Sequence, residues 1–328
     1  METHKRVAAL AIADLHLSHV APIARSCEDW FAVMERQLRQ LSALKDEHEC
    51  PILCAGDLFD RPCPPISLVN WVMANLPQMY CVPGNHDLPC HRREDMAKCS
   101  YGTLVEAERI IDLEPGKPLA IGRAGKALVL HGFGCGTPVK PLARNSRSDL
   151  ALHVAVCHEY VWAVGKGYTG APDDALVGYK WYSDFWKRLH GYDVAVFGDN
   201  HISFQFKRRK HKTREGVETG ETNPALFNCG GFFCRKSDER GHKPSVGLIH
   251  EDGTVSRQYL DVSADKWLDP DQVPAEANGI GFQGFIEQLG DLGAAAMDFA
   301  ASVHRSLERD KVPQEVKDFM LAALEGKQ

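Results

Sequence analysis

The sequence predicts an α/β fold with at least one sheet that is partly parallel and carries helices on its faces. Two observations predict this class. Short apolar runs alternate with helical patterns through the N-terminal half, in a βαβαβ rhythm. Several of the apolar runs are followed directly by Asp, Asn or His. The carboxyl edge of such a sheet is where ligands bind, so these polar residues become candidates for a functional site.

The first elements follow in order from the N-terminus. Residues 7–13 (VAALAIA) are apolar throughout and predict a strand that is buried on both faces. Apolar residues at helical intervals predict a helix over 28–45. Residues 51–56 (PILCAG) predict a second strand, 66–76 a second helix and 79–84 a third strand.

The middle of the chain predicts a hairpin over 119–132 that turns at Gly125, then strands at 151–158 and 192–201 with a helix over 180–190 between them. Beyond His201, three further apolar segments read as antiparallel strands that return to a sheet edge: 225–236, 245–250 and 255–262.

The domain organisation that we expect is one large domain over 1–262 and an appendage over 263–328. The domain contains a polar, basic insertion at about 207–222, and the appendage is a proline-rich linker followed by a helical tail. The apolar stripe of that tail has to be covered by its own domain, by a second copy of the chain in a homodimer, or by a partner protein.

Composition excludes some functions. A net charge of −6 argues against a general surface for polyanions, so a nucleic-acid substrate would need local attraction or metal ions. The eleven cysteines do not form CxxC pairs, and no stretch reaches the ~18 apolar residues of a membrane span. Reduced thiols and a cytoplasmic location are therefore expected.

The strand-end residues are all oxygen or imidazole ligands, which suits Mn²⁺, Fe or Zn²⁺ better than a thiolate cage or a calcium loop. Seven such groups are too many for one ion and suit two ions that share a bridging carboxylate, an arrangement that activates water and clamps a phosphoryl group. The bland alternative is that these residues only hydrogen-bond to loops. The candidates are Asp14, His16, Asp57, Asn85, His158, Asp199 and His201.

Together, the segments DLH, GDLFDR, GNHD, a lone strand-end His and GDNH resemble the calcineurin-like metallophosphoesterase superfamily, over roughly residues 7–260. Within it, AGDLFDRPCPP and PGNHDLP look most like the DNA-repair exonuclease branch, the nuclease subunit of SbcCD-type complexes. The resemblance implies a four-layer αββα sandwich of two mixed sheets, with a dinuclear site at the sheet edge. It also suggests an ATPase as the partner of the helical tail.

By that resemblance, Asp14, His16 and His201 would hold one metal ion and Asp57 would bridge to the second. Asn85, His158 and Asp199 would hold the second ion. His86 would be the acid near the leaving group, and Asp60 would orient it. One position departs from the family, since Asp199 stands where a His is usual. The extra negative charge should favour Mn²⁺, the cofactor that we expect, or Mg²⁺ over zinc.

Several positions leave two interpretations open. His131 in LVLHGFG competes with His158 for the lone-histidine role and could lie close to the site. The basic run KRRKHK, with Lys207, Arg208 and Arg209, could guide a phosphodiester backbone or be a solvated hairpin tip. Arg61 could touch a phosphate or cap a turn.

The function predicted first is a metal-dependent phosphodiesterase that acts on DNA as an exonuclease or endonuclease. The alternative is a phosphomonoesterase with the same chemistry, for which LVLHGFG is the favourable feature. A third hypothesis is an inactive binding or scaffold protein on this fold, which the intact set of strand-end residues argues against.

Overall fold

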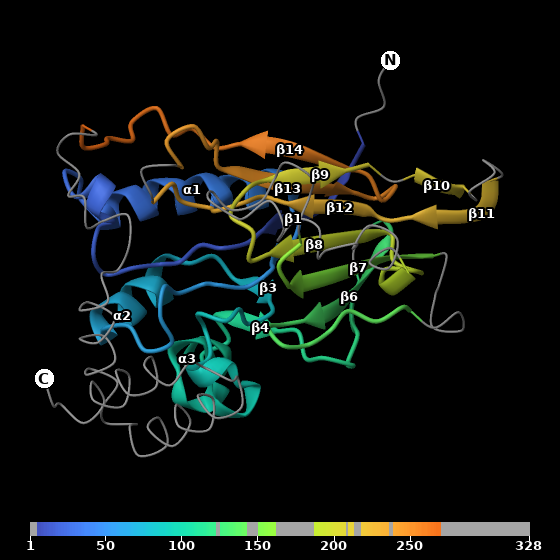
Figure 1. Ribbon diagram of the computed structural model, residues 1–328, viewed down its shortest axis with the longest axis horizontal. Coiled ribbons are helices and arrows are strands. Elements are labelled where there is room, and N and C mark those ends of the chain that lie inside the picture. Colours follow the sequence, from blue (N-terminus) through green and yellow to red (C-terminus); the bar gives the residue numbers. More distant parts are fainter. Residues whose placement is uncertain are drawn as a thin grey trace, which may run out of the picture. The chain divides into compact units, whose positions relative to one another are not determined.

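The computed structural model describes residues 5–122, 125–142, 150–161, 187–207, 209–212, 218–235 and 239–269. All of them belong to one compact unit, Met1–Pro270. Two six-stranded sheets and a two-stranded hairpin make up its β-structure (Figure 1).

The first sheet contains four parallel strands extended by two antiparallel ones. β1, β2, β3 and β4 run parallel, and β13 and β14 continue the sheet in antiparallel fashion beyond β1. In spatial order the strands are β14 (Val255–Tyr259), β13 (Ser245–His250), β1 (Val7–Ile12), β2 (Ile52–Cys54), β3 (Met79–Cys81) and β4 (Ile110–Asp112).

The second sheet repeats this plan. β6, β7, β8 and β12 are parallel, and an antiparallel strand closes each edge. The order is β5 (Leu119–Ile121), β6 (Ala127–Phe133), β7 (Ala151–His158), β8 (Val194–Gly198), β12 (Ala225–Asn228) and β9 (Phe204–Phe206). The predicted α/β class with mixed sheets is thus confirmed.

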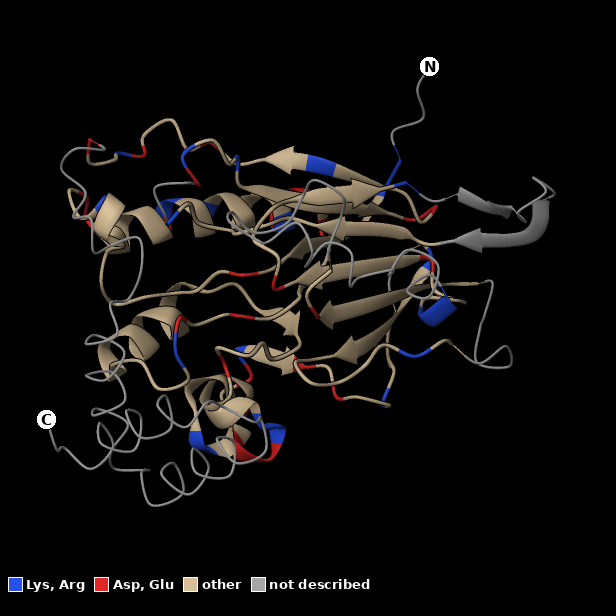
Figure 2. Ribbon diagram, viewed as in Figure 1, with Lys and Arg blue, Asp and Glu red and all other residues tan. Residues whose placement is uncertain are grey.

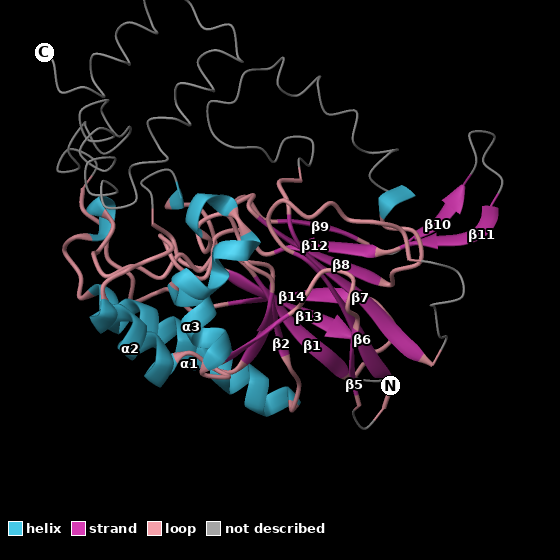
Figure 3. Cartoon of the chain, turned by 90° about the horizontal axis from the view of Figure 1, so that it is seen from below, coloured by secondary structure: helices cyan, strands magenta, loops and turns pink. Residues whose placement is uncertain are grey.

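Three α-helices cover one face of the first sheet, as Figure 3 shows from a second direction. They are α1 (Trp30–His48), α2 (Ile66–Asn75) and α3 (Ser100–Glu106). α1 begins where the Asp29 carboxylate accepts a hydrogen bond from the Ala32 amide, and it ends at Glu49 in the left-handed conformation. Short 3-10 turns stand at Ile23–Arg25, Pro89–His91 and Arg93–Lys98.

Strand β1 shows why the two sheets pack closely. Leu10 and Ile12 point to the helices, whereas Ala9 and Ala11 point to the second sheet, where they meet leucines and valines of β6, β7 and β8. Every residue of β1 is buried, as its apolar sequence predicts. Strands β1, β6, β7 and β8 carry no Lys, Arg, Asp or Glu (Figure 2). The charged side chains that follow these strands therefore stand at the strand ends.

One strand prediction is wrong. The segment that starts at Ala225 was expected to form an antiparallel edge strand, but β12 runs parallel to β8 and lies inside the second sheet, with β9 outside it. The basic insertion is a hairpin of β10 (Arg209–Lys212) and β11 (Glu218–Asn223). Because the two strands pair antiparallel, the two ends of the insertion lie together. β11 leads directly into the amino end of β12.

Some expectations fall on residues that the structure does not describe. These include Arg208, most of the helix predicted over 180–190 and the tail from residue 270 onward. Residues of the predicted linker up to Leu268 do pack on the domain, since Asp265 pairs with Arg25 at 2.9 Å. The boundary at 262 stays a prediction. No helix in the described part of the chain is long and apolar enough to cross a bilayer.

Candidate metal centre

Side chains from the carboxyl ends of five strands, three in the first sheet and two in the second, converge on one place. Within the described residues, three groups of His and Asp have ligand atoms within 4.8 Å of one another. They are Asp14 with His16 and His201, Asp14 with Asp57 and His158, and His16 with Asp57 and His86. The groups share members, so they form a single cluster.

The backbone at this edge is unusually shaped. Asp14, His16, Asp57 and Asp199 all have positive φ angles, between 45° and 81°. Non-glycine residues seldom adopt this conformation, which costs free energy and is found mostly at functional sites. The strained turns direct the side chains of adjacent strand ends toward one another.

Two glycines make room for the cluster. A Cβ on Gly84 would lie 2.0 Å from Oδ1 of Asp57, and a Cβ on Gly56, whose φ is +94°, would lie 2.4 Å from Nδ1 of His158. A glycine before Asp57 and before Asn85 is therefore required by close approach as much as by the turn.

In the first half of the cluster, two imidazoles face each other. Nε2 of His16 lies 3.0 Å from Nε2 of His201 and 3.5 Å from Oδ2 of Asp57. His16 is 2% exposed and Asp14 is 1% exposed. Oδ1 of Asp14 accepts a hydrogen bond from the Asp199 amide, while its buried Oδ2 has no partner among the described residues.

In the second half, Nδ1 of His158 donates to the carbonyl of Ala55 at 2.7 Å, because a carbonyl can only accept. Nε2 of the same ring then points to Oδ1 of Asn85, 2.9 Å away, and to Oδ1 of Asp57, 3.5 Å away. Asp57 thus stands between the two halves, with one oxygen toward His16 and the other toward His158.

The pKa values of the cluster reflect burial together with the mixture of carboxylates and imidazoles. Burial raises the pKa of Asp14 to about 7. Burial also raises the pKa of Asp199, and that of His158 is raised because the attraction of Asp57 and Asp14 outweighs burial. Burial and the nearby Arg235 hold the pKa of His16 well below its usual value, so this imidazole stays neutral. Neutral imidazoles among buried carboxylates are ready to bind a cation.

The residues present fit divalent metal ions. The orphaned oxygen of Asp14, the facing Nε2 atoms of His16 and His201, and the approach of His158 to Asn85 each place lone pairs where a cation would satisfy them. The donor set is that of divalent-metal sites of the dinuclear kind, with oxygen and imidazole nitrogen only.

His86 lies at the exposed rim of the cluster, with its ring 4.8 Å from that of His16. Its Nδ1 bonds to the main-chain carbonyl of Asp60 at 2.9 Å. The contact that was expected from the Asp60 side chain is thus made by its main chain. The Asp60 carboxylate instead pairs with Arg235 at 2.5 Å.

One acidic residue that the sequence analysis left without a role is central to the local structure. The buried carboxylate of Asp87 accepts hydrogen bonds from the amides of Leu58, Phe59 and Gly84. It thereby ties the loop after β2 to the loop after β3. Burial and the neighbouring Asp57 raise its pKa to about 6. The feature of the sequence that could have indicated this role is the position of Asp87 directly after Gly84, Asn85 and His86.

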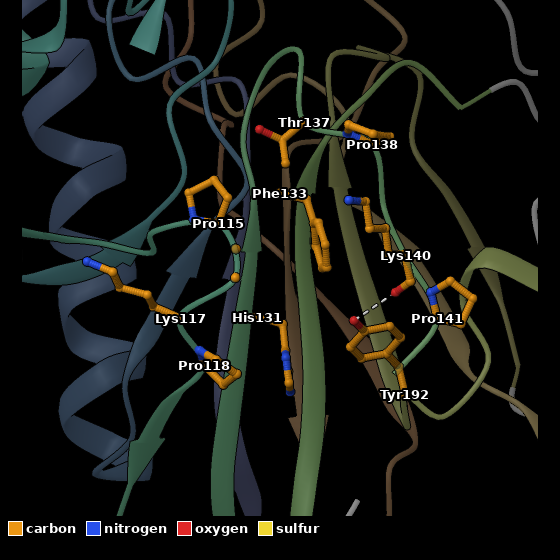
Figure 4. Close-up of a pocket in the computed structure, with 12 residues that line it drawn as sticks. Pro115, Lys117, Pro118, His131, Phe133, Thr137, Pro138, Lys140, Pro141 and Tyr192 are labelled. Carbon is orange, nitrogen blue, oxygen red and sulfur yellow. Dashed lines mark hydrogen bonds between the residues drawn. The ribbon is translucent and has the colours of Figure 1, made fainter. Parts of the chain in front are cut away.

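The remaining predicted site residues are scattered. Arg61 and Lys207 are exposed, and Arg209 lies in β10, where only the backbone is described. His131 is on β6, apart from the cluster, on the wall of a cavity of about 340 Å³ together with Phe133, Lys140 and Tyr192 (Figure 4). Its Nε2 contacts Nδ1 of His153 at 3.2 Å. The lone histidine that the structure brings into the cluster is His158.

The chain matches a known protein family, the calcineurin-like phosphoesterases, over residues 8–203. The match covers more than half of the chain and the whole span from Asp14 to His201. The chain belongs to the calcineurin-like phosphoesterase family. The His and Asp clusters that could hold metal ions lie within the matched residues. Among curated proteins, no sequence matches.

Solved structures with a related fold are distant in sequence. Sulfate thiohydrolase SoxB of Termus thermophilus, in complex with glycerol, is 11% identical, with 86% of this chain and 62% of that chain covered and a TM-score of 0.43. NAD nucleotidase (NadN) of Haemophilus influenzae is 14% identical, with 81% of this chain and 54% of that chain covered and a TM-score of 0.38. The 5'-nucleotidase of Candida albicans SC5314 is 11% identical, with 84% of this chain and 56% of that chain covered and a TM-score of 0.41. The chain spans less than two thirds of each of these proteins.

Proposed function

We propose that the protein hydrolyses phosphomonoesters of small molecules at a centre of two divalent ions. One ion would be held by Asp14, His16 and His201 and the other by Asn85, His158 and Asp199, with Asp57 between them. The observation that carries the proposal is the position of Asp57, whose two carboxylate oxygens each lie 3.5 Å from a different imidazole. A bridging carboxylate in a two-ion site needs this arrangement.

The ions, when bound, would lower the pKa of a water molecule and neutralise the charge of the phosphoryl group. The chain's own residues do the rest. Asp14 and Asp57 supply buried negative charge on the two sides of the centre. His86 stands at the open rim. As an imidazolium it would donate its Nδ1 proton in the bond to the carbonyl of Asp60 and could give its Nε2 proton to the departing oxygen.

The charge around the centre supports a small ester over a polymer. A polynucleotide is gripped by cations spread over several phosphates, whereas one phosphate group can be held by the ions alone. This chain has a net charge of −6. Arg235, the cation that borders the cluster, already pairs with Asp60.

A second candidate is cleavage of phosphodiester bonds in nucleic acid. The basic composition of KRRKHK is the feature that favours it, although β11 leads into the amino end of β12, opposite the strand ends that carry the site. The two candidates share the same centre and differ only in how the rest of the substrate is held. The resemblance to repair nucleases, the homodimer and the ATPase partner stay predictions, and the tail on which both partner predictions rest lies outside the described residues.

Rates on p-nitrophenyl phosphate, a 5'-nucleotide, bis-p-nitrophenyl phosphate and single- and double-stranded oligonucleotides with Mn²⁺ test the proposal. We expect the monoesters to react faster than the diesters by at least about tenfold, a difference of 1.4 kcal/mol in transition-state binding. Faster cleavage of the oligonucleotides would favour the second candidate. Ion binding without any hydrolysis would favour a scaffold. Asp57→Asn serves as the inactive control.

The ion that we propose is Mn²⁺. Asp199 occupies a position where an imidazole is usual in the family, and an added carboxylate favours harder cations over zinc. The carboxylate is half-buried, and the Coulombic influence of His158, Asp57 and His201 on its pKa supports a position facing the centre.

A further inference from the structure

The loop that follows β12, described at residues 229–235 and 239, is bonded to the candidate centre at several points. The amide of Gly231 donates to the carbonyl of His201 at 3.1 Å, and the amide of Phe232 donates to the carbonyl of Asp14 at 3.1 Å. Sγ of Cys229 lies 3.1 Å from the amide of Ala13. The loop therefore follows both strand ends that carry the first group of ligands.

Arg235 of this loop connects two carboxylates. Its Nη2 lies 2.5 Å from Oδ1 of Asp60, and its main-chain amide donates to Oε2 of Glu239 at 2.6 Å. Asp60 comes from the loop after β2, so one arginine joins segments that are 175 residues apart. Arg235 and Asp60 are both only partly exposed, at 20% and 31% of their side chains. Such a pair is shielded from solvent and keeps its geometry better than a surface pair.

The two carboxylates stand behind the two imidazoles of the first ion site. Oδ1 of Asp60 is 4.0 Å from Nδ1 of His16, and Oε1 of Glu239 is 3.7 Å from Nδ1 of His201. The other nitrogens of these rings, the Nε2 atoms, face each other 3.0 Å apart. Each imidazole thus has a carboxylate on the side away from its partner ring.

The carboxylates behind the two rings can fix the orientation of the imidazoles. An imidazole that offers Nε2 to a cation carries its proton on Nδ1, and that N–H needs an acceptor to fix the ring. Nδ1 of His16 is buried and has no hydrogen-bond partner among the described residues. The Asp60 carboxylate, with Oδ1 4.0 Å away, is the acidic group that the structure places near it.

We propose that Arg235 and Glu239 are positioning residues for the first metal ion, with Arg235 holding Asp60 and Glu239 in place behind His16 and His201. This inference rests on the proposed function. An arginine suits the task because its planar guanidinium holds a carboxylate in a fixed orientation, which a lysine ammonium does not do. The sequence carries no local signal for either residue, since only the folded loop brings them to the centre.

The test is calorimetric titration of the metal-free protein with Mn²⁺, for the wild type, Glu239→Gln and Arg235→Lys. Glu239→Gln keeps the size of the side chain and removes its charge, whereas Arg235→Lys keeps the charge and removes the planar guanidinium. We expect one of the two ions to bind about 10- to 100-fold more weakly in each variant, with the other ion unchanged. Hydrolysis should then recover at saturating Mn²⁺, with KM for the ester unaltered. A merely structural defect would not be rescued by the ion.

The matched control is Arg240→Lys. Arg240 lies in the same segment, but its guanidinium stacks on Trp267, 5.3 Å from the ring centre. It should bind both ions like the wild type. Unchanged affinities in Glu239→Gln and Arg235→Lys overturn the inference, and so does an equal loss of both ions. If the wild type binds two ions but hydrolyses no ester, the proposed function fails while the affinities still decide the roles of Arg235 and Glu239. A wild type that binds no ion overturns both.

Discussion

His16 and His201 bring two ring nitrogens within 3.0 Å of each other, and His131 and His153 do so within 3.2 Å. The first pair stands at the strand ends beside Asp14 and Asp57, in a cluster of possible ligands. The second pair lies along the middle of β6 and β7, and in the described part of the chain no group of three ligand atoms forms around it. Close imidazoles alone do not make a cation site.

The difference lies in the charge that surrounds each pair. At the strand ends, the buried carboxylates of Asp57 and Asp14 raise the pKa of His158. Oδ2 of Asp14 has no hydrogen-bond partner among the described residues. On β6, burial and the neighbouring His153 lower the pKa of His131 to about 4, which makes it a neutral core residue. The carboxylates, positioned by strained turns, make the first histidine pair part of a candidate metal centre. The predictions below remove, keep or exchange these charges.

The largest effect is expected for Asp57→Asn. Without the negative charge between the two halves, the histidines of the centre should resemble the pair on β6 and lose their ions. Hydrolysis should fall by more than about 10,000-fold, because bound ions lower the pKa of water by up to about nine units. Metal analysis after gel filtration measures the loss directly. Normal metal content in this variant would show that Asp57 is not the bridge.

His86→Ala should separate catalysis from ion binding. The residue is at the exposed rim, so we expect both ions to bind normally while kcat falls by about 100- to 1,000-fold. The loss should be greater for an alkyl phosphate, whose leaving oxygen needs a proton, than for p-nitrophenyl phosphate. Equal losses on the two esters would contradict a role as the acid.

The pair on β6 should make the fold sensitive to acid. The folded pKa of His131, about 4, is below the value of about 6.5 in the unfolded chain. The unfolded state therefore takes up the proton first, and this contribution to stability is complete above pH 6.5 and is lost as the pH falls toward 4. The loss is on the order of 3 kcal/mol.

Urea unfolding of the wild type and His131→Gln at pH 7 and pH 4.5 measures this contribution. The variant should lose less stability between the two pH values than the wild type does. His19→Gln, which changes an exposed histidine, is the control and should follow the wild type. A wild-type loss that His131→Gln leaves unaltered would assign the acid sensitivity to other groups.

The smallest effect is expected for Asp199→His, which restores the residue that is usual in the family. The ratio of activity with Zn²⁺ to activity with Mn²⁺ should rise, within about one order of magnitude, because an imidazole replaces a hard carboxylate. Parallel assays with the two ions measure the ratio. A ratio equal to that of the wild type would place the Asp199 side chain outside the coordination of either ion.

The centre was easier to predict than the topology around it. Asp14, Asp57 and His158 are recognisable because each directly ends a buried, apolar parallel strand, and strand ends of this kind meet at one edge. β12 was assigned to the wrong direction because its four residues, ALFN, carry no information about which neighbour they pair with. That choice depends on the packing of Phe227 between the sheets.

The residues around the ligands were harder still. Glu239 and Arg235 acquire a role only through contacts made across most of the length of the domain, and their own neighbourhood in the sequence reads as a polar loop. Asp60 shows an intermediate case. Its nearness to His86 was anticipated, but the orientation of its carboxylate depends on Arg235, which no motif announces.

The centre draws residues from strand ends in both sheets: β1, β2 and β3 in one, β7 and β8 in the other. Because the ligands come from both sheets, a bound pair of ions would link the two sheets at the interface where the alanines of β1 pack against β7 and β8. Removal of the ions by a chelator should accordingly weaken the packing between the two sheets before either sheet unfolds. The supply of metal would then govern how long the two sheets stay packed together.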